Sequence, residues 1–275
     1  MQPNLPFPRL LTIAGSDSGG GAGIQADLKT FAALGAYGAS VITAITAQNT
    51  VGVDKICITP PDLIEAQCSS VLSDMRIDAV KIGMLADIAS IQAVANQLKQ
   101  FSLPFVVLDP VMVATSGDSL AQEDTVTALK QILLPLADLI TPNLYELAML
   151  VGKQQAQNEM EMLAQGQLLL QQGLCKALLL KGGHLIQSQE SVDWLLELNA
   201  EPICFRTKRI QTENTHGTGC TLSSAIAALR PQRISLAETI SDAKNYVQGA
   251  IAAGQYWQLG HGHGPLAHFW SVLKS

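Results

Sequence analysis

Short apolar runs alternate with longer amphipathic segments along almost the whole chain. The short runs are rich in Val, Ile and Leu, whereas the longer segments repeat apolar residues at helical spacing. The pattern predicts strands at 10–14, 39–47, 79–82, 105–108, 139–141, 177–180, 194–196 and 203–207. It predicts helices at 24–34, 61–72, 88–98, 124–133, 142–150, 160–171, 221–229 and 236–253.

Strands that are separated by helical segments indicate βαβ crossovers and therefore a mostly parallel sheet. The uninterrupted apolar run at 105–108 indicates a strand that is buried on both faces. No linker, repeat or low-complexity segment breaks the pattern, so we expect residues 1–275 to form a single three-layer α/β/α domain. Ligands of open α/β sheets lie beyond the carboxyl ends of the strands. Asp109, Asn143 and Lys181 each lie where a predicted strand ends and should face one crevice.

Composition narrows the possible functions. The chain has 48% hydrophobic and 15% charged residues, which predicts a large core, and its net charge is −6. The negative charge argues against general nucleic-acid binding and against attraction to an anionic membrane surface. The N-terminus shows no signal-peptide pattern, and no apolar run is long enough to span a membrane. The five cysteines are widely spaced and odd in number, which favours reduced thiols and a cytoplasmic protein.

The segment NTHGTGCTLSSAIAAL, residues 214–229, places a glycine-rich turn before a helix. Backbone N–H groups at a helix start favour an anion, and the same position can lower a thiol pKa from about 8.5. We therefore predict that Cys220 takes a proton from a bound alcohol while the amides of Gly217, Thr218 and Gly219 hold a phosphoryl group. The alternative is a glycine-rich helix cap with a small buried thiol.

A second glycine cluster, AGSDSGGGAGIQADLKTF at residues 14–31, also joins a strand to a helix. It is neither a dinucleotide fingerprint, because Ile24 occupies the third glycine position, nor a Walker A loop. We expect its backbone to contact a ligand, and the alternative is a tight strand-to-helix turn. Asp27 lies one turn into the helix, where a carboxylate can also simply complement the helix dipole.

Polar residues at three further strand ends are candidates for ligand binding. The Gln48 carboxamide suits a heterocycle edge, whereas Asn49 fits a simple turn equally well. Asn143 and Glu146 share one helix face and suit Mg²⁺, although the same pair also fits a capping box. Lys181, in KGGH, suits a phosphate, with an ordinary turn as the alternative.

The histidines show no recognised spacing of metal ligands, and we expect no metal site in GHGHGPLAHF, residues 260–269. The histidines are His184, His216, His261, His263 and His268.

Taken together, the motifs resemble the ribokinase superfamily, and within it the vitamin kinases that phosphorylate hydroxymethylpyrimidine in thiamine biosynthesis. The matching motifs span essentially the whole chain in order: AGSDSGGGAGIQADLKTF, AITAQNT, KIGML, LDPVM, ITPN with NLYE, KGGH, NTHGTGCTLS and GHGPLAHF. The resemblance implies a ribokinase-like fold and an ATP- and Mg²⁺-dependent transfer to a primary alcohol. It also implies a second transfer to the resulting monophosphate, and a homodimer.

The resemblance also implies roles for residues at matching positions. Gln48 would read the aminopyrimidine edge, in a pocket lined by Gly15, Asp27, Met84 and Val111. Glu146, Asn143 and Asp109 would bind Mg²⁺ and the ATP phosphates, with Glu146 as the main metal ligand. Lys181 and the amides of residues 217–220 would hold the transferred group.

Two positions vary within the superfamily. Most members carry an Asp base where this chain has Cys220, so the thiol is either a base or a positioning group. Some relatives carry Lys where this chain has Thr115, so we expect no cation at that position.

Three other functions compete with this interpretation. A pyridoxal or pyridoxine kinase would use a similar ring alcohol. A non-catalytic pyrimidine sensor would bind the ring without turnover, but Cys220, Lys181 and Glu146 together argue against it. A nicotinamide-dependent oxidoreductase is disfavoured by the imperfect glycine spacing.

Overall fold

The computed structural model describes residues 7–112, 123–183 and 189–272, and its strands form one nine-stranded sheet. The strand order is β3-β2-β1-β4-β5-β6-β7-β8-β9. The neighbours from β2 to β7 pair in parallel, whereas β2–β3, β7–β8 and β8–β9 pair antiparallel. The mostly parallel sheet predicted from the sequence is therefore confirmed. The strands are β1 Arg9–Ser16, β2 Tyr37–Gln48, β3 Val53–Ile58, β4 Ala79–Ile82, β5 Val106–Leu108, β6 Leu139–Ile140, β7 Ala177–Lys181, β8 Glu190–Glu197 and β9 Ile203–Lys208.

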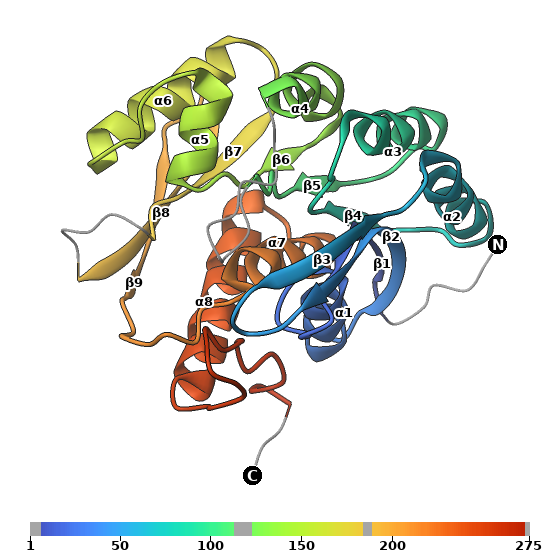
Figure 1. The fold of residues 1–275 in the computed structure, drawn as a ribbon. Helices are drawn as coiled ribbons and strands as arrows, with labels where there is room; N and C mark the ends of the chain where they lie inside the picture. The colour runs from blue at the N-terminus through green and yellow to red at the C-terminus, as the bar shows by residue number, and fades with distance from the viewer. Residues whose placement is uncertain (1–6, 113–122, 184–188, 273–275) are drawn as a thin grey trace.

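Helices cover both faces of this sheet and give three layers (Figure 1). One face carries α1 (Gly23–Ala33), α7 (Thr218–Leu229) and α8 (Leu236–Gly254). The other carries α2 (Pro61–Asp74), α3 (Ile88–Gln100), α4 (Glu123–Ala128), α5 (Leu144–Val151) and α6 (Glu159–Gln171). A π-helical turn (Leu129–Leu133) and a 3₁₀ turn (Leu134–Leu136) extend α4, and a 3₁₀ turn (Arg230–Gln232) follows α7.

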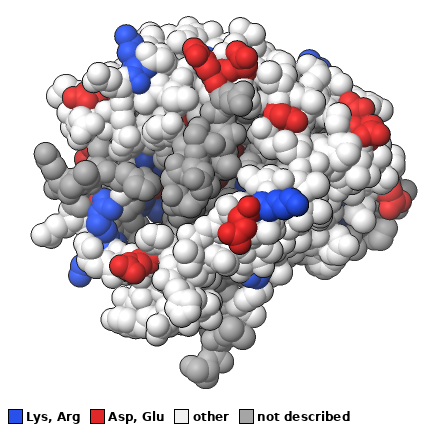
Figure 2. Space-filling model, viewed as in Figure 1, with Lys and Arg blue, Asp and Glu red and all other residues white. Residues whose placement is uncertain are grey.

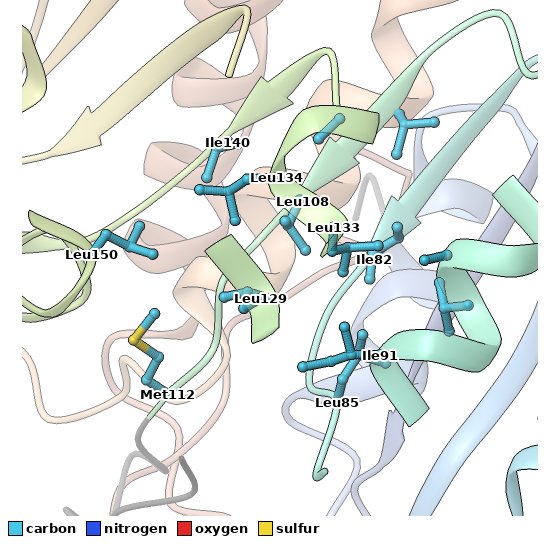
Figure 3. Close-up of a cluster of buried hydrophobic side chains, with 14 of the residues drawn as sticks. Ile82, Leu85, Ile91, Leu108, Met112, Leu129, Leu133, Leu134, Ile140 and Leu150 are labelled. Carbon is cyan, nitrogen blue, oxygen red and sulfur yellow. The ribbon is translucent and has the colours of Figure 1, made fainter. Parts of the chain in front are cut away.

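The continuous apolar strands are explained by burial on both sides of the sheet. Successive side chains of a strand point to opposite faces, so Val106 and Leu108 pack in the layer of α2–α6 while Val107 packs against α7 and α8. Figure 3 shows the first of these clusters, where Leu108 and Ile82 of the sheet meet side chains of the covering helices. This two-sided core holds the strand ends in fixed positions.

The structure corrects three details of the predicted elements. β3 was not predicted, because it is an edge strand with five of its six residues exposed and therefore lacks a buried face. The helix expected from Pro142 begins at Leu144, because the Asn143 side chain caps it. The helix expected at 124–133 is α-helical only to Ala128 and then widens into the π turn.

Acidic and basic side chains are scattered among each other over the face shown in Figure 2. Among the helices that the structure describes, none is both long and apolar enough to cross a membrane.

Candidate active site

A cavity of about 880 Å³ lies at the carboxyl ends of the parallel strands. It brings together residues between positions 14 and 251 of the chain, most of which come from strand ends, from the loops that follow them and from the helices α7 and α8. Of the predicted site residues, those lining the cavity are Gly15, Gln48, Met84, Asp109, Val111, Asn143, Glu146, Lys181, Gly217, Thr218, Gly219 and Cys220. Asp27 is the exception.

The start of α7 contributes backbone amides and a thiol to the cavity. The N-cap is Gly217, whose left-handed conformation (φ 81°) and close packing on the Gly21 carbonyl exclude a side chain. The helix begins at Thr218, three residues earlier than predicted, so Cys220 lies in the first turn. The Thr218 amide donates to the Thr215 carbonyl at 3.2 Å. The amides of Gly219 and Cys220 are therefore the better candidates for an anion, since helix-start amides lack intrahelical acceptors.

The Cys220 thiol differs from the expectation of a lowered pKa. Burial raises its pKa to about 11, and the carboxylates of Asp27 and Asp109 act in the same direction. The Lys81 ammonium and the Gly23 amide oppose this effect without cancelling it. In the free protein at neutral pH the sulfur is therefore a protonated thiol, because desolvation outweighs the helix-start field.

Lys181 joins two carboxylates at the floor of the cavity. Its Nζ lies 2.7 Å from Asp109 Oδ1 and 3.8 Å from Glu146 Oε2. Thr141 also donates to Asp109 Oδ1, at 2.9 Å. A methyl group placed on Gly219 would lie 3.4 Å from both Asp109 Oδ2 and Lys181 Nζ, so the start of α7 directly adjoins the ion pair.

These charges perturb one another strongly because they are buried. Burial raises the pKa of Glu146 to about 7, and Asp109 adds to this while Lys181 opposes it. Burial acts against ionisation of Asp109 as well, but Lys181 and Lys81 hold its pKa below the usual value. One carboxyl of the cluster is therefore only partly ionised near pH 7, and a cation at this position would favour its charged form.

The capping-box interpretation of Asn143 and Glu146 is confirmed. The Glu146 carboxylate accepts from the Asn143 amide at 2.7 Å, and the Asn143 side chain accepts from the Glu146 amide at 2.9 Å. Both residues still line the cavity, so the cap fixes the carboxylate beside Lys181 and does not remove it from the site.

The cavity is also lined by the residues expected to bind the ring. The Thr46 hydroxyl donates to the Ser16 carbonyl at 2.8 Å and lies 3.1 Å from Gln48 Oε1, so the carboxamide packs against a fixed hydroxyl. A Cβ on Gly15 would lie 2.5 Å from Met84 Cε, so glycine at this position allows Met84 to pack closely. Asn49 forms the expected turn, because its side chain accepts from the amides of Val51 and Gly52.

Asp27 does not line the cavity, in contrast to the expectation, and instead pairs with Lys81, which does line it. Lys81 Nζ lies 2.9 and 2.8 Å from the two Asp27 oxygens, and both side chains are 0% exposed. Hydroxyls of Thr12 and Ser224 donate to the same carboxylate. Lys81 was not among the predicted site residues, although a lysine inside the apolar strand AVKI needs a buried partner and therefore signals one.

Part of the first glycine loop is bound internally, so three of its amides already have an acceptor, although Gly15, Ala22 and Gly23 of the same segment line the cavity. Asp17 accepts from the amides of Gly19, Gly21 and Ala22 at 2.8, 3.0 and 2.8 Å. Asp17 also lies 2.9 Å from His216 Nε2. Burial tends to raise the pKa of Asp17, but His216 and the loop amides lower it overall. This part of the loop is thus an internally bound turn that contacts the loop before α7.

The cavity extends beyond the predicted residues towards β8, β9 and α8. Asp193 of β8 and Lys244 of α8 form a buried ion pair in this part, and Asp193 also accepts from the Gly182 amide at 3.1 Å. Neither residue lies in a motif that the sequence analysis used, so no local signal pointed to them. Thr115 and His184 lie outside the described residues.

The described residues contain no cluster of three or more His, Cys, Asp or Glu side chains arranged to hold a metal ion. His216 and His268 instead contact Asp17 and Thr221. A divalent cation in the cavity would therefore rely on one or two carboxylates and on ligand oxygens, as Mg²⁺ commonly does.

Comparisons with known proteins agree with this geometry. The sequence profile of the family described as phosphomethylpyrimidine kinase matches residues 17–267. The hydroxymethylpyrimidine/phosphomethylpyrimidine kinase of Escherichia coli (strain K12) is 53% identical over 259 residues, which cover 94% of this chain and 96% of that protein.

Solved structures of related kinases share the fold. A Bacillus subtilis pyridoxal kinase in complex with ADP superposes with a TM-score of 0.89 at 33% identity, covering 98% of this chain and 100% of the other. A phosphomethylpyrimidine kinase from Clostridium difficile 630 gives a TM-score of 0.77 at 41% identity, covering 89% and 99%.

Proposed function

The chain belongs to the phosphomethylpyrimidine kinase family, and we propose that it transfers a phosphoryl group from ATP to the alcohol of 4-amino-5-hydroxymethyl-2-methylpyrimidine. We propose that it then transfers a second phosphoryl group to the resulting monophosphate, and that both steps serve thiamine biosynthesis. One observation carries the proposal: the helix start with Cys220 adjoins the Lys181–Asp109 pair in the same cavity that Gln48 borders. The cavity thus combines the Gln48 carboxamide with a lysine and the backbone amides of a helix start.

We propose that the pyrimidine binds along the Gln48 wall. The carboxamide offers a donor and an acceptor in one plane, which matches an amino group beside a ring nitrogen. Gly15, Met84 and Val111 also line the cavity and would supply apolar contact with the ring. Asp27 supports this wall only indirectly, from its buried position with Lys81.

The transferred phosphoryl group would lie between Lys181 and the amides of Gly219 and Cys220. Phosphoryl transfer needs alignment and compensation of negative charge more than covalent help from the protein. Lys181 supplies a full positive charge, and helix-start amides supply fixed partial charges in a site with little water. Thr218 and Gly217 contribute by fixing the turn that presents these amides.

Mg²⁺ fits the carboxylate side of the cavity. Asp109, Glu146 and Asn143 offer oxygen atoms there, and the raised pKa of Glu146, caused mainly by burial, indicates a site that an additional cation would stabilise. When bound, Mg²⁺ would neutralise part of the charge on the ATP phosphates.

We propose that Cys220 contacts the reacting hydroxyl. A pKa of about 11, raised by burial, supports a protonated thiol that orients the alcohol in the free enzyme. The thiol becomes a base only if bound ligands lower its pKa.

Cys220→Ala should lower kcat by about 10²- to 10⁴-fold with nearly unchanged pyrimidine affinity, in the range of general acid–base groups. Cys220→Ser keeps a donor but is a much weaker acid. Turnover retained in the serine variant would identify a positioning role, and loss in both variants would identify a base. Near-normal turnover of the alanine variant would reject either role.

The activity itself is tested by incubating the protein with Mg-ATP and each candidate alcohol while ADP release is measured. We expect turnover of the hydroxymethylpyrimidine and of its monophosphate. Binding of the pyrimidine without any ADP release would instead identify a sensor.

Pyridoxal phosphorylation is the second candidate, because the Bacillus subtilis pyridoxal kinase superposes over 98% of this chain. The same assay with pyridoxal and pyridoxine separates the two activities. Turnover of pyridoxal alone would reject the pyrimidine assignment.

We also propose that the chain acts as a single kinase domain, in the cytoplasm and as a homodimer. All five cysteines are free, which supports a reducing compartment. The exposed side chains of Ile45, Ile56 and Ile58 on β2 and the edge strand β3 support an apolar contact between copies. Light scattering coupled to size exclusion tests the dimer, and a monomer mass at micromolar concentration would reject it.

A further inference from the structure

The C-terminal loop, residues 260–268, contains a motif to which the proposed function gives no role. The loop is anchored on α8, where the Ala267 amide donates to the Ala250 carbonyl at 3.1 Å and Tyr246 donates to the His268 carbonyl. Leu266, Ala267 and His268 are nearly fully buried. The loop is therefore a fixed part of the fold and is held by a helix that itself lines the cavity.

One end of the loop packs on the turn that follows Gln48. The Gly262 amide donates to the Thr50 hydroxyl at 3.2 Å. A Cβ on Gly262 would overlap the Thr50 carbonyl, and a Cβ on Gly260 would overlap the Thr50 side chain. The two glycines thus allow the loop backbone to pack closely on Thr50, two residues after the proposed ring-binding residue Gln48.

The middle of the loop pairs with the segment before α7. The His216 amide donates to the Gly264 carbonyl at 3.1 Å, and His216 and Pro265 form a parallel β-bridge. A Cβ on Gly264 would overlap the Asn214 side chain, so the close approach again depends on glycine. This contact holds the residues directly before the N-cap of α7.

The far end of the loop reaches the first turn of α7 through His268. His268 Nε2 lies 3.1 Å from Thr221 Oγ1, and Thr221 Oγ1 lies 2.8 Å from the Gly217 carbonyl. The single hydroxyl proton of Thr221 goes to this carbonyl, so His268 must donate its Nε2 proton to Thr221. Burial lowers the pKa of His268 to about 4, with smaller contributions from Lys29 and His216, which agrees with a neutral donor ring.

We propose that the C-terminal loop is a positioning element that fixes the distance between the ring-binding turn after Gln48 and the amides at the start of α7. His268 acts as a positioning residue through Thr221 and the N-cap Gly217, and Gly262 acts through Thr50. The inference rests on the proposed kinase function for its consequences on turnover, but the coupling between the loop and α7 is a property of the fold.

Its physical basis is the sensitivity of group transfer to alignment. Two substrates that bind on different elements react well only if those elements keep their separation, and a displacement near 1 Å can cost about 10²-fold in rate. A loop that contacts both elements and is anchored on a third restricts that separation.

The first experiment replaces His268 by Phe, which keeps a buried ring but removes the donor. We expect kcat to fall about 10-fold while the dissociation constant of the pyrimidine changes less than about 3-fold. Hydrogen exchange followed by mass spectrometry should show faster exchange in the peptide covering residues 214–222 and unchanged exchange in the central strands. His268→Gln, which retains a donor, should restore most of the turnover.

His261→Phe is the matched control, because it places the same substitution at an exposed position of the same loop. It should leave kcat and amide exchange unchanged. Normal kcat and normal exchange in the folded His268→Phe variant would overturn the proposal, as would an equal increase of exchange throughout the protein.

The second experiment tests the other end and does not depend on His268. Gly262→Ala forces the loop away from Thr50, and we expect the pyrimidine KM to rise about 10-fold with a smaller change of kcat. Gly52→Ala is its control, because a Cβ there meets nothing within 4 Å in the opposing turn. Identical kinetics of the two alanine variants would contradict the proposal.

Amide hydrogen exchange tests the coupling between the loop and α7 independently of the proposed kinase activity. If the wild-type protein turns over no alcohol, the kinase assignment fails, but faster exchange of residues 214–222 in His268→Phe would still support the coupling. If turnover is normal and exchange in both loop variants matches the wild type, the coupling alone is wrong.

Discussion

Removing the ammonium of Lys81 should destabilise the protein far more than removing an exposed lysine. The pair that it forms with Asp27 is 0% exposed on both sides, with Nζ–O distances of 2.9 and 2.8 Å. Burial disfavours the ammonium, yet Asp27, Cys220 and Asp109 together hold the pKa of Lys81 above its usual value. Lys81→Met leaves the Asp27 carboxylate buried without its counter-ion.

The expected loss follows from that burial. Breaking a buried ion pair by removing one partner costs about 3–5 kcal/mol, because the remaining charge keeps its desolvation penalty. For a chain of 275 residues this corresponds to a decrease in Tm of roughly 5–9 °C. Thermal and urea unfolding, followed by circular dichroism, measure both quantities.

Two further variants make the reasoning refutable. The double variant Lys81→Met/Asp27→Asn removes both charges and should recover most of the lost stability, because a neutral buried pair carries no desolvated charge. Lys176→Met removes the lysine of a pair whose side chains are 64% and 27% exposed, and it should cost less than about 1 kcal/mol. The assigned cost of the buried charge is wrong if Lys81→Met loses no more free energy of unfolding than Lys176→Met. It is also wrong if the double variant is as unstable as Lys81→Met alone.

Three other changes test separate parts of the site. Gln48→Leu should weaken pyrimidine binding at least about 10-fold while ATP binding stays nearly constant, which titration calorimetry with each ligand measures. Equal losses of affinity for the pyrimidine and for ATP would point to misfolding. Gly217→Ala should destabilise the fold by at least about 2 kcal/mol and lower kcat, because the φ of Gly217 is 81° and a Cβ would overlap the Gly21 carbonyl. A urea unfolding curve close to that of the wild type would disprove the need for glycine at this position. Burial lowers the pKa of His268 to about 4 in the folded protein, whereas its pKa in the unfolded chain is near 6.5. The unfolded chain therefore binds a proton at His268 more tightly, and the free energy of unfolding should fall as the pH drops from about 6.5 towards 4. Urea unfolding across that range should show a weaker pH dependence in His268→Phe, and identical slopes would count against the assigned environment.

The strand ends of the site could be predicted because they depend on local patterns. Asp109, Asn143 and Lys181 lie at the ends of apolar strands, and parallel strands place such positions at one edge of the sheet. The glycine turn before α7 was equally visible, since glycine followed by a helical pattern marks a helix start. The edge strand β3 was not predicted, because an exposed strand has no buried face to create a pattern.

The electrostatic roles depended on contacts between distant segments. Asp17 was overlooked because its partners include His216, 199 residues away, and its carboxylate uses the glycine-loop amides that a ligand was expected to contact. The thiol of Cys220 was expected to be acidic from its position on a helix. Its pKa is raised instead, because other elements bury it and place two carboxylates nearby.

By itself the sequence determined the alternation of strands and helices, the mostly parallel sheet and the edge at which ligand-binding residues gather, because hydrophobic periodicity records which faces are buried. Only the tertiary structure decided which buried charge pairs with which partner, which loop amides are already used, and that the C-terminal loop contacts both the turn after Gln48 and the segment before α7. Those properties arise from distances between segments that no local pattern encodes.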